Sequence, residues 1–403
     1  MLFAVPFYSV LTLFSNRRYK SQPFAEQLLH ILHALRVPSW TNPEITPELL
    51  KVYKVSGSLT NDVFFVSCPS VPHTRIVLLR VYGHSSGALI SRPRELHTLH
   101  VLSSQYQIGP RLYGTFENGR IEEYLESNAL TADELRDQTI SAWTGARMAE
   151  LHGVDVMAVE GRLPPVDGEE NRWRVVTEQN VESWLSLARD VLQLPAAPEA
   201  VRRSLDLDTF EQEWAQYVQW LHEFETVHGP SRRVFSHNDA QYGNLLRLKT
   251  LKPGLPEHHQ IIVVDFEYAG LNAAAFDIAN HFHEWTANYH SSTPHLLNPA
   301  LYPNEEQRRN FYCAYLKHDT SAVADGTTSE LSSLEEAKLQ KLEDQVRAWS
   351  PASHAMWAVW GVVQAREFLE GSDGEPEFDY LGYAQCRIDA FRRDIRALGT
   401  ILS

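Results

Sequence analysis

Three polar side chains occur in an order that suits the chemistry of phosphate groups. Asp239 and Asn244 share the segment SHNDAQYGNLL, and Asp265 ends the apolar run IIVVD. One carboxylate can accept the proton of an attacking hydroxyl, while an amide and a second carboxylate can hold the magnesium ion that bridges nucleotide phosphates. The pattern therefore predicts ATP-dependent phosphoryl transfer, with Asp239 as the base and Asn244 and Asp265 as metal ligands.

Short strands are expected on both sides of these residues. One should enter the loop at 234–235 and another should leave it at 245–248, before a turn rich in proline and glycine. The β-branched run 261–264 predicts a buried strand that ends at Asp265. Glu267 shares a face with Asp265 on an extended segment, so it is a candidate for a second ion or for the substrate. Oxygen ligands of this kind suit Mg²⁺.

The length and composition of the chain limit its class. It has 403 residues and a formal net charge of −15. This length suffices for two lobes around a cleft, and the acidic total argues against a nucleic-acid partner. The cysteines Cys68, Cys313 and Cys386 are scattered, without a CxxC pair. That spacing argues against a disulfide framework or a zinc site and favours a reducing compartment, the cytoplasm.

The first residues are apolar and are followed by Arg17, Arg18 and Lys20. The apolar run 1–14 is shorter than the roughly 20 residues that a membrane span needs, and it lacks the basic start of a secretory signal. We expect a peripheral helix or an extension that packs on the neighbouring lobe, without stable membrane insertion. Weak membrane attachment is the alternative.

A small lobe that binds the nucleotide is expected upstream of the catalytic loop. Strands at 52–56 and 63–67 enclose a turn of small and polar residues, which suits phosphates, although an ordinary hairpin explains the turn equally well. A later strand, 120–125, is the expected hinge against adenine, with Glu123 as a candidate nucleotide contact. The candidates in the turn are Gly57, Ser58, Thr60 and Asn61.

A single charge interrupts the apolar strand expected over Ile76–Tyr82. A buried Arg80 needs a partner, and Glu95, on the amphipathic segment Pro93–Leu102, is the best candidate. Such a pair would be the arginine version of the Lys–Glu pair with which kinases orient phosphates. The alternative is an Arg80 on an edge strand that faces water.

Several separate blocks of the sequence resemble the choline/ethanolamine kinase family. They are GSLTNDVFFV, VLLRVYG, GPRLYGTFENGRIEEYL, HNDAQYGNLL, VVDFEYAGLNAAAFDIANHFHEW and ASHAMWAVWGVVQA. The likeness spans roughly residues 50–395. Two of the blocks resemble fungal choline kinases more than dedicated ethanolamine kinases, which usually carry bulkier residues in place of AQYG.

The resemblance implies an α+β, protein-kinase-like bilobal fold. It implies an N-terminal extension or helical region (1–49), an N-lobe with an antiparallel sheet (50–125) and a larger, mainly helical C-lobe (126–403). It also implies ATP- and Mg²⁺-dependent phosphorylation of choline to phosphocholine, the first step of phosphatidylcholine synthesis by the CDP-choline route. The family's base and metal or phosphate roles carry over to the three residues of the catalytic segment.

A pocket for a quaternary ammonium should be aromatic, because such an ion offers no N–H donor. Trp357 and Trp360 lie on one face of a strongly helical segment. Glu284 and Tyr289 are expected on a helix that begins near Phe276, and Glu284 is a candidate counter-charge. Core packing at helical spacing is the alternative for the two tryptophans. The resemblance places substrate contacts at Asp239, Gln241, Tyr268, Glu284, Tyr289, Trp357, Trp360 and Tyr383.

Other polar residues have structural interpretations. Asp277 should brace the catalytic loop by accepting backbone N–H bonds, and His237 should orient that loop. His281 and His283 could suggest a metal site, but a packed or surface pair is the simpler interpretation.

Three alternative functions stay open. An ethanolamine kinase, or an enzyme of dual specificity, shares the same chemistry, although a primary ammonium would prefer carboxylates. An aminoglycoside-type phosphotransferase shares the catalytic loop, but its polycationic substrate calls for many acidic residues. A pseudokinase or interaction protein is the alternative from another class. A homodimer is one of the assemblies that the sequence leaves open.

Overall fold

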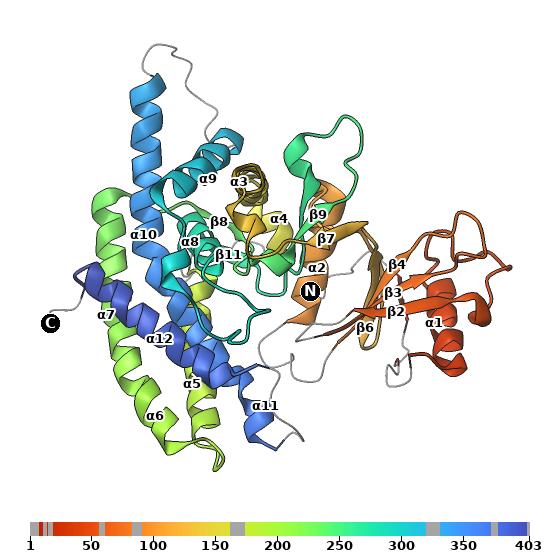
Figure 1. Ribbon diagram of the computed structural model, residues 1–403, viewed down its shortest axis with the longest axis horizontal. Coiled ribbons are helices and arrows are strands. Elements are labelled where there is room, and N and C mark those ends of the chain that lie inside the picture. The colour runs from red at the N-terminus through yellow and green to blue at the C-terminus, as the bar shows by residue number, and fades with distance from the viewer. Residues whose placement is uncertain are drawn as a thin grey trace. The chain divides into compact units, whose positions relative to one another are not determined.

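The computed structural model describes residues 8–10, 14, 19–55, 61–82, 91–161, 174–319, 331–371 and 378–400. The chain divides into two compact units, Met1–Ser127 and Asn128–Ser403. The first unit is built on a sheet and the second is mainly helical (Figure 1). This confirms the expected α+β class with a small sheet-containing part and a larger helical part.

The sheet of the first unit has six strands in the order β1-β5-β6-β4-β3-β2. β1 pairs with β5 in parallel, and the other pairings are antiparallel. The strands are β1 (Tyr8–Val10), β2 (Lys51–Val55), β3 (Asn61–Ser67), β4 (Val77–Tyr82), β5 (Leu112–Phe116) and β6 (Gly119–Glu123). The expected strands at 52–56 and 63–67 are thus confirmed as an antiparallel pair.

One apolar core joins this sheet to helix α1 (Gln22–Ala34). Phe24 of α1 lies 5.8 Å from Phe64 of β3 and 4.7 Å from Phe14, measured between ring centroids. Asn118, in the turn before β6, donates to the Phe14 carbonyl and accepts from its N–H, both at 2.8 Å. The N-terminal extension therefore packs on this unit, as expected.

The alternative form of that extension, a peripheral helix, is wrong for residues 8–10. They form an edge strand instead, since β5 would otherwise leave unpaired backbone groups on that side of the sheet. Within the described part of the chain, no helix combines the length and the apolar character that crossing a bilayer requires.

The second unit is dominated by long helices. α10 runs beside α5, α8 and α12, and α3 packs against α9 (Figure 1). The helices are α3 (Gln138–His152), α4 (Val156–Glu160), α5 (Val176–Leu192), α6 (Glu199–Leu205), α7 (Leu207–His228), α8 (Ala274–Glu284), α9 (Glu305–His318), α10 (Leu331–Gln364), α11 (Arg366–Leu369) and α12 (Tyr380–Ala397).

Side chains satisfy the free N–H groups at the start of several helices. Asp137 accepts from the N–H groups of Thr139 and Ile140 at the start of α3. Asn304 and Gln307 form a reciprocal capping box on α9. Each such cap contributes about 1 kcal/mol to stability, so these helix starts are specified locally.

Two small strand ladders frame the predicted catalytic residues. One ladder has the order β10-β9-β7 and the other pairs β11 with β8. Their strands are β7 (Ser127–Ala129), β8 (Arg233–Ser236), β9 (Leu245–Leu248), β10 (Ile261–Val263) and β11 (Gly270–Ala273). The segment 237–244 therefore runs from one ladder to the other, and the segment 264–269 runs back.

Gly145 of α3 makes a testable contact in the packing against α9. A Cβ at this position would lie 2.7 Å from the carbonyl oxygen of Phe311, which is backbone and cannot rotate away. Gly145→Ala should therefore lower the free energy of unfolding by about 1–3 kcal/mol, although alanine is the better helix former. Thermal or urea unfolding followed by circular dichroism measures the change.

Ser186→Ala is the matched control, because Ser186 lies on the exposed face of helix α5. It should alter stability by no more than about 0.5 kcal/mol. A Gly145→Ala protein as stable as the parent would mean that α3 and α9 are not packed as described.

Candidate active site

The register of the two ladders brings the catalytic and metal segments together. Leu245 at the start of β9 faces Val263 at the end of β10, so the residues just beyond them are neighbours. The Val264 N–H accordingly donates to the Asn244 carbonyl at 3.0 Å. Asn244 and Asp265 are thereby held at one end of the same strand pair, as the sequence analysis expected.

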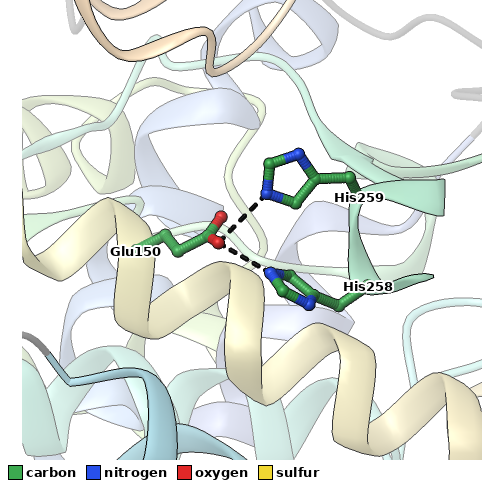
Figure 2. A group of neighbouring side chains, drawn as sticks. All are labelled: Glu150, His258 and His259. Atoms are coloured by element: carbon green, nitrogen blue, oxygen red, sulfur yellow. Dashed lines mark hydrogen bonds and ion pairs between the residues drawn. The ribbon is translucent and has the colours of Figure 1, made fainter. Parts of the chain in front are cut away.

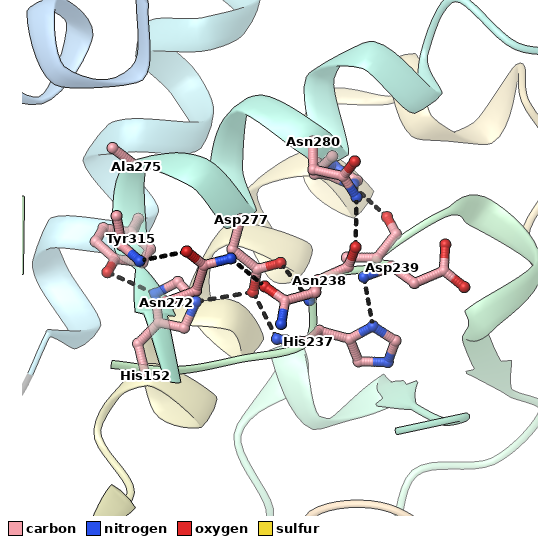
Figure 3. A network of polar contacts seen from close by, with 12 residues as sticks. His152, His237, Asn238, Asp239, Asn272, Ala275, Asp277, Asn280 and Tyr315 are labelled. Carbon is pink, nitrogen blue, oxygen red and sulfur yellow. Dashed lines mark hydrogen bonds and ion pairs between the residues drawn. The ribbon is translucent and has the colours of Figure 1, made fainter. Parts of the chain in front are cut away.

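Asp277, in the first turn of α8, holds the start of the catalytic loop (Figure 3). Its two carboxylate oxygens accept the backbone N–H groups of His237 and Asn238, both at 2.8 Å. His152, the last residue of α3, lies with Nε2 3.0 Å from Oδ2 of Asp277. Burial alone would raise the pKa of Asp277, but His152 and the loop N–H groups outweigh it and hold that pKa below its ordinary value. The predicted bracing role is confirmed.

Asn238 turns the chain so that the next residue can carry its side chain out of the core. Its φ of +64° is left-handed, a conformation that asparagine tolerates better than most residues. The Asn238 side chain donates to the Tyr268 carbonyl at 2.9 Å and accepts from Asn272 at 2.8 Å, and its carbonyl accepts from Asn280 at 3.1 Å. Figure 3 shows these three asparagines around the loop.

His237 orients the loop through both ring nitrogens. Nε2 lies 2.9 Å from the Val264 carbonyl, which can only accept, while Nδ1 accepts the Asp239 N–H at 3.2 Å. The ring is therefore neutral with its proton on Nε2. Burial lowers the pKa of His237 in agreement with this assignment. These contacts support the predicted orienting role.

Asp239 projects from the loop beside Asn244. The Asn244 amide donates to the Asp239 carboxylate at 2.8 Å and to its carbonyl at 2.9 Å. Burial and the nearby charges of Glu284, Asp265 and Glu267 raise the pKa of Asp239 well above its ordinary value. The second unit therefore gathers several carboxylates around the residue that we predicted as the base.

This donor set fits a magnesium ion. Asn244 and Asp265 offer hard oxygen ligands, and Glu267 lies in the turn that follows. A dication among these groups would offset the carboxylate repulsion that raises the pKa of Asp239. Asp265 has a left-handed φ of +68°, so the backbone is strained at this predicted metal ligand.

The predicted aromatic residues form one cluster in the second unit. Trp357 lies 5.2 Å from Trp360 and 5.3 Å from Tyr268, and Trp360 lies 6.0 Å from Tyr383, measured between ring centroids. The Trp360 indole donates to the Tyr268 hydroxyl at 2.8 Å. The Trp357 indole donates to the side-chain oxygen of Asn280 at 2.8 Å.

Glu284 has partners that sequence reasoning missed. Its Oε1 accepts from buried Arg387 at 2.7 Å, and its Oε2 accepts from the Tyr289 hydroxyl at 2.6 Å. Arg387 also donates to the Tyr383 hydroxyl at 2.9 Å. Arg387 thus neutralises Glu284 and positions Tyr383, while Glu284 positions Tyr289.

Tyr289 and Gln241 occupy different local structures. The prediction that Tyr289 lies on the helix of Glu284 is wrong. Helix α8 ends at Glu284, and the Thr286 hydroxyl donates to the His283 carbonyl at 2.6 Å. Gln241 starts the 3₁₀ turn 242–244 and accepts the Gly243 N–H at 2.7 Å.

In the first unit, Arg80 belongs to a buried charge cluster. It lies on the inner strand β4 and is 8% exposed, so the alternative of an edge strand facing water is wrong. Its Nε is 3.5 Å from Glu122. Glu95, on α2 (Arg92–Val101), binds Arg120 at 2.6 Å and Arg92 at 2.7 Å. Arg120 and Glu122 thus belong to the same buried charge cluster as Arg80 and Glu95, the two residues predicted from the sequence.

The structure describes only some of the remaining residues predicted to contact the nucleotide. Gly57, Ser58 and Thr60 lie outside the described residues, and Asn61 begins β3. Glu123 ends β6, where its N–H donates to the Arg111 carbonyl at 2.8 Å and its carboxylate accepts the Arg111 N–H at 3.3 Å. These bonds close the end of the strand pair.

His281 and His283 are buried helix residues with separate partners. His281 Nδ1 lies 2.8 Å from the Ala240 carbonyl, and its Nε2 accepts from the Trp285 indole at 3.2 Å. His283 Nε2 lies 2.8 Å from the Ser350 hydroxyl. The expectation of packed side chains is confirmed, and that of a surface pair is wrong.

Asn280 and Arg387 are the main residues that sequence reasoning did not single out. Asn280 lies one helical turn after Asp277, and therefore on the same face of α8. That spacing was a usable signal. Arg387 lies one turn after Tyr383 on α12, but its partner Glu284 is 103 residues away, and nothing local points to it.

The chain is similar to known proteins over most of its length. A sequence model of the family described as choline/ethanolamine kinase matches residues 52–392. A choline kinase of Schizosaccharomyces pombe is 33% identical over 420 residues, which cover 93% of this chain and 90% of that protein. A choline/ethanolamine kinase of Homo sapiens is 33% identical over 356 residues, 86% of this chain and 80% of that protein.

Solved structures support the fold. A choline kinase of Cryptosporidium parvum matches with a TM-score of 0.69 at 22% identity, over 93% of this chain and 97% of that one. An ethanolamine kinase of Plasmodium vivax matches with a TM-score of 0.67 at 19% identity, over 97% and 99%. Both agree with the protein-kinase-like fold expected from the sequence.

The two hydrogen bonds of His281 predict a dependence of stability on pH. Burial lowers the pKa of His281 from 6.5 to about 4. Protonation would also prevent the ring from accepting the Trp285 indole N–H. The unfolded chain therefore binds this proton first as the pH falls. The stabilisation is complete above pH 6.5 and declines between pH 6.5 and 4, by about 2 kcal/mol from pH 7 to 5.

Urea unfolding at pH 7 and pH 5 measures this contribution. His281→Asn should reduce the pH-dependent loss by that amount, whereas His228→Asn, at an exposed position on α7, should leave the loss unchanged. An identical pH dependence in the parent and in His281→Asn would show that His281 titrates normally.

Proposed function

Because this chain belongs to the choline/ethanolamine kinase family, we propose that it transfers the γ-phosphoryl group of ATP to the hydroxyl of choline. The proposal rests on one structural link. The Trp357 indole donates to Asn280, and Asn280 donates to the carbonyl of Asn238, the residue before Asp239. An aromatic cluster suited to a quaternary ammonium is thereby tied to the carboxylate suited to its hydroxyl.

The proposed reaction needs one proton transfer by the protein. The choline oxygen forms a bond to the γ-phosphorus, the bond from that phosphorus to the bridging oxygen breaks, and ADP leaves. Asp239 takes the hydroxyl proton. The Asn244 amide fixes the rotation of the Asp239 carboxylate.

Asn244, Asp265 and Glu267 are the residues that we propose hold Mg²⁺. The ion, when bound, neutralises charge on the nucleotide phosphates. We assign Arg80 and Glu95 of the first unit to phosphate orientation, and the turn 57–61 and Glu123 to nucleotide contacts. The buried Arg120 and Glu122 support this assignment, since they hold Glu95 and Arg80 in fixed positions.

The charges around the aromatic cluster favour choline over ethanolamine. A primary ammonium needs hydrogen-bond acceptors, whereas a trimethylammonium group needs aromatic faces. Both oxygens of Glu284 already accept bonds, from Arg387 and Tyr289. Tyr268, Trp360 and Tyr383 remain as the aromatic surface, so we expect the higher kcat/KM for choline.

We infer a reducing compartment, the cytosol, for this protein. Its three cysteines are free thiols, one buried, one exposed and one half-buried, at Cys68, Cys313 and Cys386. A homodimer stays a prediction, which sedimentation of the full chain tests.

Measuring the phosphorylated product formed from ATP tests both the proposed function and the assignment of Asp239 as the general base. Phosphorylated product should form with choline, more slowly with ethanolamine, and not without amine or without magnesium. Asp239→Asn should reduce kcat by about 10²–10⁴-fold, because the proton acceptor is lost. It should change choline affinity by less than tenfold. Near-normal turnover by Asp239→Asn would refute the assignment, and a parent protein that binds neither Mg·ATP nor choline would favour a non-catalytic role.

Trp360 tests the aromatic cluster, because it is only partly buried and its replacement should leave the fold intact. Trp360→Ala should raise the choline KM by about 5- to 30-fold, which corresponds to about 1–2 kcal/mol of cation–π contact. Trp360→Phe should raise it less. Trp220→Ala, where the ring packs on Tyr217 and Phe224 of α7, is the control and should leave KM unchanged. An unaltered KM in Trp360→Ala would exclude this cluster as the choline contact.

A further inference from the structure

Three side chains outside the catalytic segment converge on one point. Glu150 comes from α3, and His258 and His259 come from the 3₁₀ turn Glu257–Gln260, which leads into β10. The Nε2 atoms of the two histidines lie 2.7 Å and 3.1 Å from the same oxygen, Oε1 of Glu150. Figure 2 shows both imidazole rings directed at this carboxylate from the same side.

The separations suit a small metal ion. Zinc binds imidazole nitrogen at about 2.0–2.1 Å and carboxylate oxygen at about 2.0–2.2 Å, so the ligand atoms of a tetrahedral site lie about 3.3 Å apart. One nitrogen or oxygen atom from each of the three residues lies within 4.8 Å of the others. Small side-chain rotations would therefore admit the ion without movement of the backbone.

The protonation states also suit a metal. Burial would raise the pKa of Glu150, but Arg147 and the two histidines hold it below its ordinary value, so the carboxylate is charged. Burial lowers the pKa of His258 despite the neighbouring carboxylate. Because a carboxylate can only accept, Nε2 carries the ring proton in the metal-free site, and this proton must move to Nδ1 or be lost when Nε2 binds a metal. Arg147 pairs with the other oxygen of Glu150 and fixes the direction of Oε1.

The group is open enough to admit an ion from solution. The side chains of Glu150, His258 and His259 are 27%, 11% and 25% exposed. Three protein ligands leave room for water at the fourth position of a zinc site. Imidazole nitrogen favours zinc and its neighbours in the first transition row over magnesium, so these ligands differ in chemistry from Asn244 and Asp265.

We propose that Glu150, His258 and His259 form a binding site for a divalent transition-metal ion such as Zn²⁺. The ion would tie the turn 257–260 to α3. That turn joins β9 to β10, the strands that end beside Asn244 and Asp265. A bound ion therefore stabilises the connection between the two segments that carry the predicted magnesium ligands.

A second group of similar composition is not suited to bind a metal ion. His283, His354 and Asp394 also lie close together, but the Arg387 guanidinium lies 3.3 Å from Nδ1 of His354. Guanidinium can only donate, so Nδ1 accepts and the proton of the neutral ring is on Nε2, the atom nearer Asp394. Because Arg387 needs Nδ1 as its acceptor, the ring proton cannot move from Nε2 to Nδ1 to make room for a cation, and the adjacent guanidinium charge would repel one. We therefore assign no metal there.

Calorimetric titration of the chelator-treated full chain with ZnCl₂, in buffer that contains Mg²⁺, tests the proposal. The titration should show one binding site for Zn²⁺. Glu150→Gln and His259→Asn should each weaken Zn²⁺ binding at least tenfold. His222→Asn is the matched control, since His222 contacts Glu178 at 3.1 Å as a simple His–Glu pair. It should leave Zn²⁺ affinity unchanged.

Cobalt distinguishes the proposed ligands from Cys313, which is exposed on α9. Co²⁺ should give visible absorption bands without a sulfur-to-metal charge-transfer band, and Cys313→Ser should keep them. The melting temperature of the parent should rise with Zn²⁺, and that of Glu150→Gln should not. Binding that survives in both Glu150→Gln and His259→Asn, or that is lost in Cys313→Ser, would overturn the proposal, as would an absence of binding to the parent.

Discussion

The buried carboxylate of Asp277 is the interaction on which the catalytic loop depends. A buried charge is costly unless each oxygen finds donors, and here the donors are the N–H groups of His237 and Asn238 together with His152. Hydrogen bonds to a charged group contribute about 1.5–3 kcal/mol each. The same bonds that satisfy Asp277 therefore hold the backbone that presents Asp239.

Helix α8 connects the catalytic loop to the predicted aromatic pocket. Its successive turns carry Asp277, then Asn280, then Glu284 on one face. Asn280 joins the loop carbonyl to the Trp357 indole, and Glu284 is bound by Arg387 and Tyr289. One rigid helix thus sets the spacing between the predicted base and the predicted aromatic pocket, which supports transfer to a substrate held by its cationic end.

Local patterns were sufficient for much of this arrangement. The expected strands at 234–235, 245–248 and 261–264 match β8, β9 and β10 nearly to the residue. The lone charge in an apolar strand correctly indicated the buried Arg80. Two expectations were wrong for reasons that no local pattern contains. Residues 8–10 became an edge strand because the sheet offered a free edge. Tyr289 lies beyond the end of the helix of Glu284, where its N–H donates to the hydroxyl of Tyr242, 47 residues away.

The amino-acid sequence by itself determined which residues can carry charge, the strands around the catalytic segment, and the order of Asp239, Asn244 and Asp265 along the chain. The tertiary structure alone decided which charges are paired. Arg387 and Glu284, and likewise Glu150 and the histidines of the turn 257–260, are separated by about a hundred residues. Contacts of this kind depend on the packing of whole helices, because a side chain meets such a partner only after the segments between them have folded.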